Sequence, residues 1–175
     1  MIGKILLAYD GSENGRRALN VAAELSRKLE ADLTIVHVLM HGRPASELVR
    51  MAEIEHLVKQ VQESGLPGFT PRGVGAYEML DMTGPNGQSQ RVIAAIGDQL
   101  VSFAEDRANE LGARHVTTFV RSGDYADEII EAAKAQGADM IVIGSRGLGT
   151  VRGTVLGSVS QKVLHHATQT VVTVR

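Results

Sequence analysis

The feature that most constrains the fold is a regular alternation of short apolar runs with amphipathic helical segments. Lys4 to Tyr9 is an apolar run that stops at Asp10, the pattern of a buried strand followed by a turn. Over residues 13 to 30 apolar side chains recur at helical spacing, with Ser12 available as the N-cap. Leu33 to Leu39 is nearly continuous in apolar residues, which predicts a strand buried on both faces.

The same alternation resumes after residue 111. The predicted elements there are a strand at Arg114 to Val120, a helix at Asp124 to Gln136 closed by Gly137, a strand at Met140 to Ile143, a short helix that carries Val159, Val163 and Ala167, and a last strand at Thr170 to Val174. Because parallel neighbours need crossover connections, this order predicts an α/β fold with an open, mostly parallel sheet of five strands. Ligands of such sheets sit beyond the carboxyl ends of the strands, where Asp10 and Gly144 are expected.

Residues 42 to 90 interrupt the pattern and are interpreted as an insertion into a single domain of residues 1 to 175. Pro44 to about Glu63 can form a helix, whereas Ser64 to Gln90 holds six of the 19 glycines and three of the four prolines. That density favours irregular backbone or a mobile loop. A helix at about Arg91 to Leu111 then returns the chain to the sheet.

Composition excludes several classes of function. With 18 Lys and Arg against 20 Asp and Glu, the formal charge of −2 provides no excess of positive charge for nucleic acid or anionic membrane. The absence of cysteine excludes disulfides, Cys-zinc sites and thiol nucleophiles. Since no apolar run approaches the roughly 20 residues that a bilayer requires, a cytoplasmic location is the expectation.

The loop after Ile143 has the chemistry of an anion site. It reads Gly144-Ser145-Arg146-Gly147, then nine residues, then Gly157-Ser158 at the start of a helix. Glycines let phosphate oxygens approach the backbone, and a helix N-terminus offers unpaired N–H groups and partial positive charge. From the residues alone, a flexible glycine-rich connection that merely starts a helix is an equal alternative. The Walker A loop and the dinucleotide fingerprint both fail, because Lys is missing after Gly149 and Arg152 stands where a third glycine belongs.

Four segments carry a family resemblance: Ile5-Leu6-Leu7-Ala8-Tyr9-Asp10-Gly11-Ser12, Ile35-Val36-His37-Val38, Asp139-Met140-Ile141-Val142-Ile143-Gly144-Ser145-Arg146-Gly147 and Gly157-Ser158-Val159. On these residues the chain resembles the universal stress protein family, in its adenine-nucleotide-binding type. The likeness covers residues 1 to 41 and roughly 91 to 175, and the 42 to 90 insertion is longer than the family leads us to expect. The resemblance implies an adenine-nucleotide alpha-hydrolase-like, Rossmann-like sheet of strand order 3-2-1-4-5 with helices on both faces.

The resemblance also implies a role for each matched position. Asp10 would contact the adenosine near its ribose, and backbone groups of Val38 would line the adenine site. Gly144 and Gly147 would pass close to ribose and phosphates. The amides of Gly157, Ser158 and Val159 would hold the phosphates. The remaining residues that the resemblance places in the site are Ala8, Tyr9, Ile143 and Arg146. The implied ligand is ATP, or ADP or AMP, with Mg²⁺ bridging the phosphates.

Several of these residues have simpler interpretations. Asp10 could serve only as a turn or helix-capping acid. His37 lies within a buried strand and is more readily a packed core residue than a ligand. His165 and His166 lie near a helix C-terminus, where the helix dipole accounts for them. Because the chain has no cluster with metal-ligand spacing and no Gly-x-Ser-x-Gly elbow, we assign neither metal ligands nor catalytic residues.

The leading hypothesis is a cytoplasmic regulatory protein that binds an adenine nucleotide and acts as a homodimer. The resemblance suggests pairing through Thr170 to Val174, which would otherwise be an apolar sheet edge. One alternative is a slow ATP phosphohydrolase or nucleotidyl-transfer enzyme, in which Arg146 and Arg152 stabilise developing charge. Another is a nucleotide-free scaffold whose 42 to 90 insertion binds an unidentified protein partner.

Overall fold

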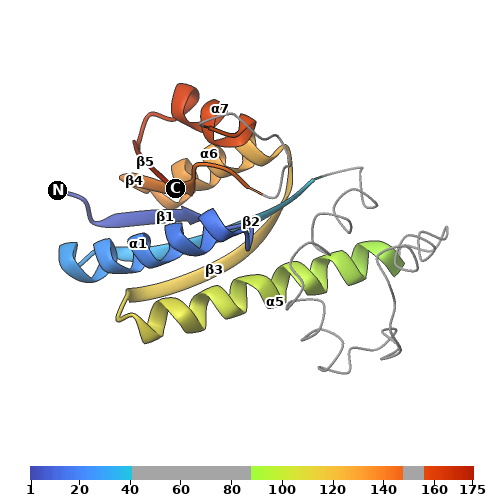
Figure 1. Ribbon diagram of the computed structural model, residues 1–175, viewed down its shortest axis with the longest axis horizontal. Coiled ribbons are helices and arrows are strands. Elements are labelled where there is room, and N and C mark those ends of the chain that lie inside the picture. The colour runs from blue at the N-terminus through green and yellow to red at the C-terminus, as the bar shows by residue number, and fades with distance from the viewer. Residues whose placement is uncertain (41–87, 148–155) are drawn as a thin grey trace.

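The computed structural model describes residues 1–40, 88–147 and 156–175 (Figure 1). The predicted helix at Pro44 to Glu63, and the 42 to 90 insertion apart from its last residues, lie outside the described residues. The described elements are β1 (Lys4–Ala8), α1 (Glu13–Leu29), β2 (Asp32–Met40), α5 (Gln88–Glu110), β3 (Arg114–Gly123), α6 (Tyr125–Gln136), β4 (Met140–Gly144), α7 (Ser158–His166) and β5 (Thr170–Val174).

The five strands form one sheet in the order β3-β2-β1-β4-β5, and every neighbouring pair is parallel. This confirms the predicted sheet and its strand order. Strand β1 lies at the centre, where Ala8 is the register partner of Val36 in β2 and of Ile143 in β4. The chain winds outward from β1 through β2 to β3 and then returns to the other side of β1 for β4 and β5. The switch in winding direction therefore falls between β1 and β4.

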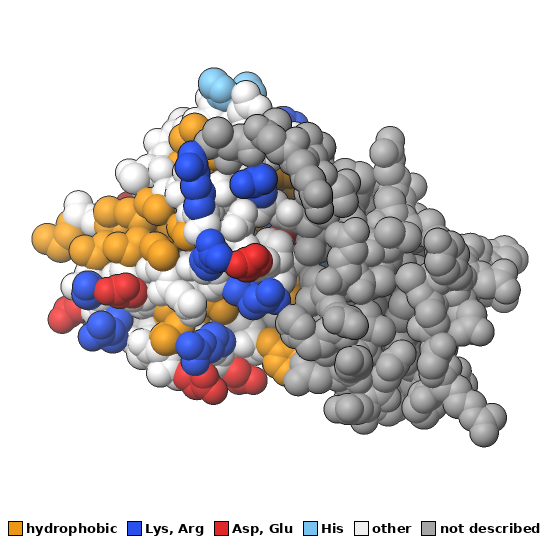
Figure 2. Space-filling model, in the orientation of Figure 1, with side chains coloured by type: hydrophobic (Ala, Val, Ile, Leu, Met, Phe, Trp, Pro, Cys, Tyr) orange, Lys and Arg blue, Asp and Glu red, His pale blue; other side chains and the backbone are white. Residues whose placement is uncertain are grey.

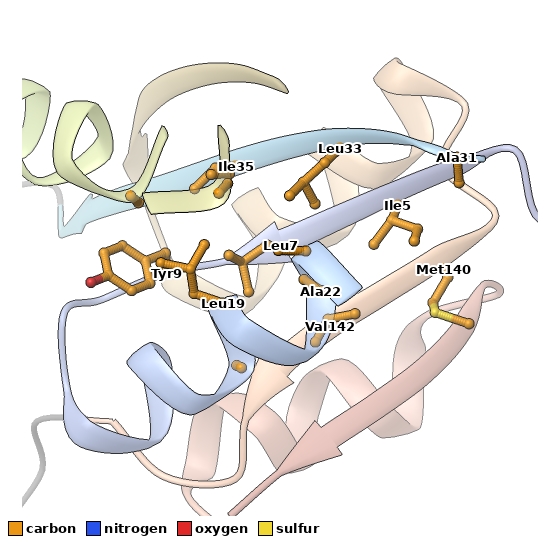
Figure 3. Close-up of a cluster of buried hydrophobic side chains, with 14 of the residues drawn as sticks. Ile5, Leu7, Tyr9, Leu19, Ala22, Ala31, Leu33, Ile35, Met140 and Val142 are labelled. Atoms are coloured by element: carbon orange, nitrogen blue, oxygen red, sulfur yellow. The ribbon is translucent and has the colours of Figure 1, made fainter. Parts of the chain in front are cut away.

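Helices α1 and α5 cover one face of the sheet, and α6 and α7 cover the other (Figure 1). The alternation of side chains along the strands explains this division. Ile5 and Leu7 of β1 point to the α1 side, where Figure 3 shows them in a row that continues to Tyr9. Leu6 and Ala8 point to the α6 side. Both faces of the sheet are therefore buried under helices, as the continuous apolar character of the strands predicts.

Two helix ends have their predicted capping residues, Ser12 and Gly137, whereas Asp124, predicted as the first residue of its helix, is the N-cap. The Ser12 side chain accepts a hydrogen bond from the Gly15 N–H, Asp124 caps α6 in the same manner, and Gly137 ends α6 with a φ of 62°. Strand β3 is longer than predicted, because pairing with β2 continues to Met40 opposite Gly123. Within the described ranges, no helix has the length and apolar character needed to cross a membrane.

Candidate functional site

The candidate site lies at the carboxyl ends of β1 and β4. The chain leaves β1 through Asp10 into α1, and it leaves β4 through Ser145 toward α7. Because adjacent parallel strands end at the same side of the sheet, these two exits and the first turns of α1 and α7 come together. The structure thus places Asp10 and Gly144 at the same edge of the sheet, as the sequence predicts.

Asp10 has a local structural contact in addition to its position at the site. Its Oδ1 accepts a hydrogen bond from the Ser12 N–H at 3.0 Å. A Cβ added at Gly15 would come within 2.6 Å of that oxygen, so Gly15 gives the carboxylate room to lie on the first turn of α1. Among the described residues, no hydrogen bond to Asp10 Oδ2 is formed, which leaves one oxygen for a ligand hydroxyl.

Gly144 is required by the packing of the two exits. A Cβ at this position would lie 3.0 Å from the Asn14 carbonyl carbon and 3.1 Å from the Gly15 nitrogen. Both atoms belong to the backbone of α1 and cannot move aside cheaply. Gly144 therefore allows the end of β4 and the first turn of α1 to touch.

Ser145 joins the elements that surround the site. It is 1% exposed, and its N–H donates to the Val174 carbonyl in β5 at 2.6 Å. Its own carbonyl accepts from the Gly157 N–H at 2.7 Å, and its Oγ lies 3.4 Å from Asn14 Nδ2. This one residue links β4 to α1, α7 and β5.

The N-terminus of α7 differs from those of α1 and α6, the other helices whose N-caps are described. Side chains of Ser12 and Asp124 cap α1 and α6, and both helices carry acidic residues in their first turns. Helix α7 has Gly157 as its N-cap, with no side-chain cap and no acidic residue in its first turn. Neither a capping side chain nor an acidic residue of the first turn therefore compensates the partial positive charge of this helix start.

Of the three N–H groups predicted to hold the phosphates, one already has a partner within the chain. The Gly157 N–H donates to the Ser145 carbonyl, so it is already used within the chain. The first bond inside α7 runs from the Gln161 N–H to the Gly157 carbonyl. Within the described chain, the Ser158 and Val159 N–H groups donate to no carbonyl outside the helix. An anion at this helix start would therefore depend on Ser158 and Val159.

Four predicted site residues have buried side chains: Ala8, Tyr9, Val38 and Ile143. Their side chains form the core, and burial raises the pKa of the Tyr9 hydroxyl above its ordinary value. Their ligand contacts would therefore come mainly from the backbone. The Val36 carbonyl accepts from the Tyr9 N–H at 2.9 Å, on the β1 side of β2. Since backbone groups alternate along a strand, the Val38 carbonyl faces the same side, beyond the end of β1.

The exposed predicted residues are Arg146, Gly147 and Ser158. Arg146 lies next to the helix start, because a Cβ at Gly157 would be 3.5 Å from its Cα. Gly147 is the last described residue before 156. Ser158 lines a hollow of about 470 Å³ together with Gln161, Lys162, His165 and His166. The Ser158 hydroxyl is thus accessible to a ligand.

The histidines follow their simpler interpretations. His37 is 5% exposed, and its Nδ1 donates to the Tyr9 carbonyl at 2.8 Å, which makes it a packed core residue. His165 and His166 occupy the last turn of α7, where the helix dipole favours positive charge. In the parts of the chain that the structure describes, no three His, Asp or Glu side chains gather as a metal site.

A charge cluster ties α7 to the start of α6. Lys162 Nζ lies 3.1 Å from Asp124 Oδ1 and 2.8 Å from Asp127 Oδ1. The Lys162 hydrogen bond, followed by the N–H groups of α6, lowers the pKa of Asp124, and the two aspartates raise the pKa of Lys162. These groups are exposed, so the cluster orients the helices more than it stabilises them.

Sequence reasoning missed Ser145 and Ser160 as site residues. Ser160 is 2% exposed, and its Oγ lies 2.8 Å from the Ser145 carbonyl and 2.9 Å from the Gly157 carbonyl. The sequence does show a small polar residue near each end of the glycine-rich segment, which is the only signal for these two serines. That signal does not reveal which partner the hydroxyl finds.

Comparison with known proteins agrees with this geometry. A family model described as the universal stress protein family matches residues 1–175. The chain belongs to the universal stress protein family. It is 29% identical over 180 aligned residues to universal stress protein YxiE of Bacillus subtilis, with 100% of both chains covered.

Solved universal stress proteins share the fold. One from Archaeoglobus fulgidus in complex with dAMP is 22% identical with a TM-score of 0.61, and the comparison covers 100% of both chains. Another, in complex with cAMP, is 22% identical with a TM-score of 0.58, covering 99% of this chain and 97% of that one. At these identities the likeness establishes the Rossmann-like fold of this universal stress protein.

Proposed function

We propose that this universal stress protein is a regulatory protein of the ATP-binding type, with an adenine nucleotide held at the carboxyl ends of β1 and β4. The observation that carries the proposal is the start of α7, which has neither a side-chain cap nor an acidic residue. Such a helix start favours an anion. The dAMP and cAMP complexes of proteins with the same fold support an adenine nucleotide as the ligand.

The family resemblance suggests the proposed contacts, and the described geometry is compatible with them. The N–H groups of Ser158 and Val159 and the exposed Arg146 would receive phosphate oxygens. The Asp10 carboxylate would accept from a ribose hydroxyl, and the Val38 carbonyl from the adenine amino group. Mg²⁺ would arrive with the nucleotide, since it commonly takes ligands from phosphates and water.

Binding, with at most slow hydrolysis, is the activity that we propose. Residues 144 to 158 contain no Asp, Glu, His or Lys that could activate a nucleophile. Arginines in this segment can stabilise charge but cannot act as general bases. Occupancy of the site would then be the signal, and a change in conformation or partner affinity would be its output.

Calorimetry with ATP, ADP and AMP tests the proposal. We expect wild type to bind at least one of them, and Gly157→Val to lose affinity by at least about tenfold. A Cβ at Gly157 would already be in van der Waals contact with the Ser145 and Arg146 backbone, so the two γ carbons of valine force the helix start to move. Gly157→Ala, which adds only that Cβ, is the matched control and should lose less. Absence of binding by wild type would overturn the proposal.

We further propose a homodimer through the edge strand β5. The Thr170 N–H donates to the Asp139 carbonyl, and the Val174 carbonyl accepts from the Ser145 N–H. These groups face β4, so the alternation of the strand turns the N–H and C=O groups of Val171 and Thr173 outward. Side chains of Val172 and Val174 are partly buried against the α1 face, as is Ile2. Figure 2 shows hydrophobic side chains gathered at the end of the molecule that carries the N-terminus.

Two proline variants distinguish this edge from the sheet itself. Thr173→Pro removes an outward N–H, so we expect a monomer that remains folded. Val172→Pro removes an N–H that faces β4 and should destabilise the fold. Sedimentation and thermal unfolding separate the two effects. A monomeric wild type at micromolar concentration would contradict the proposed dimer.

A further inference from the structure

The Ser160 side chain is a buried hydroxyl beside the proposed phosphate contacts. It is 2% exposed, and carbonyl oxygens of Ser145 and Gly157 lie 2.8 and 2.9 Å from its Oγ. A hydroxyl carries one proton, so it donates to one of these oxygens at a time. Both acceptors are main-chain carbonyls, and the burial of Ser160 keeps its hydroxyl away from solvent.

The hydroxyl connects the first turn of α7 to a fixed point of the sheet. The Ser145 carbonyl accepts from both Ser160 Oγ and the Gly157 N–H, while the Ser145 N–H donates to Val174. Two bonds from α7 therefore converge on the carbonyl of a residue whose N–H is already bonded to β5. With Gly157 as the N-cap and no side-chain cap, these bonds take the place of the usual restraint on a helix start.

We infer that Ser160 is a positioning residue of the proposed anion site, which directs the Ser158 and Val159 N–H groups without touching the ligand. This inference rests on the proposed nucleotide binding. Ser158, two residues earlier, is exposed and lines the hollow on α7, so the two serines have different tasks. Ser158 is accessible to a phosphate, and Ser160 holds the backbone that presents it.

The chain offers a matched control at the opposite end of the sheet. Ser26 in α1 is 0% exposed, and its Oγ donates to the Ala31 carbonyl at 2.6 Å and accepts from the Arg114 N–H at 2.8 Å. Like Ser160, it is a buried helical serine with two backbone partners. Ser26→Ala therefore measures the general cost of losing such a hydroxyl, away from the proposed site.

The experiment compares ATP and adenosine by calorimetry for wild type, Ser160→Ala, Ser160→Thr and Ser26→Ala. We expect Ser160→Ala to bind ATP about tenfold more weakly and adenosine within about twofold of wild type, since only phosphate contacts depend on the helix start. Ser160→Thr keeps the hydroxyl and should restore ATP affinity. Ser26→Ala should lower the melting temperature without changing the ratio of the two affinities. If Ser160→Ala does not fold, Ser160→Cys, with a similar volume and a weak donor, takes its place.

The outcomes separate the two proposals. If wild type binds neither ATP nor adenosine, the proposed function is overturned and this inference with it. If wild type binds ATP and Ser160→Ala binds it equally well, only the positioning role is overturned. An equal loss for ATP and adenosine would also overturn it, because it would reveal a general structural effect.

Discussion

The two ends of the sheet use similar polar side chains for opposite purposes. At the amino end, Asp139 Oδ2 accepts from the N–H groups of Gly3 and Lys4, and Ser26 joins α1 to the start of β3. At the carboxyl end, Ser145 and Ser160 make equally specific contacts, yet they leave the start of α7 uncapped. The difference shows that short polar side chains can cap the backbone at one end of a sheet and leave a helix start without a side-chain cap at the other.

The largest difference between the two ends is expected when a methyl group is added at each of them. Gly144→Ala places a Cβ 3.0 Å from the α1 backbone, whereas a Cβ at Gly3 meets only Asp139 Oδ2, at 3.8 Å. We expect Gly144→Ala to lower the free energy of unfolding by about 1–3 kcal/mol and to weaken nucleotide binding. Urea unfolding and calorimetry measure the two effects.

Gly3→Ala serves as the control for this prediction. Because its new Cβ has ordinary contacts, its unfolding free energy should stay within about 0.5 kcal/mol of wild type. Equal stability of the two variants would show that α1 can shift away from β4 at little cost.

The sequence predicts the local features of this fold better than its long-range contacts. The strands and helices followed from apolar spacing, and the caps at Ser12 and Gly137 from residue type, because these signals are local. The end of β3 was missed because Arg121-Ser122-Gly123 is polar and is held by pairing with β2. The contact between Ser145 and Ser160 joins residues 15 positions apart in the sequence. No local sequence pattern specifies a contact over that separation.

A second pair of variants compares the aspartates of the two ends. Asp10→Asn keeps an oxygen that can accept from the Ser12 N–H but removes the charge that would favour a ribose hydroxyl. We expect adenosine affinity to fall about tenfold, with little change in stability. Asp139→Asn should lower the melting temperature and leave affinity unchanged. An effect of Asp139→Asn on adenosine binding would contradict the assignment of functions to the two ends.

The smallest expected effect is a pH dependence at the amino end. The N–H groups of Gly3 and Lys4 lower the pKa of Asp139, and the positive charges of the N-terminus and Lys4 act in the same direction. Its stabilisation is therefore complete above the ordinary aspartate pKa of about 3.9 and is lost as the pH falls through the lower folded-state value. Urea midpoints of wild type and Asp139→Asn should differ near neutral pH and converge in acid. A constant difference would assign the effect to packing.

The Ser145 amide has a consequence for measurement. This N–H donates to the Val174 carbonyl at the end of β5, the carbonyl of the same residue accepts from the start of α7, and the residue is 1% exposed. Exchange of this proton with deuterium requires local opening of its bond to β5, so the exchange rate reports on β5 directly and on α7 through the neighbouring carbonyl of the same residue. A single resonance therefore tests both the proposed ligand binding and the proposed subunit pairing.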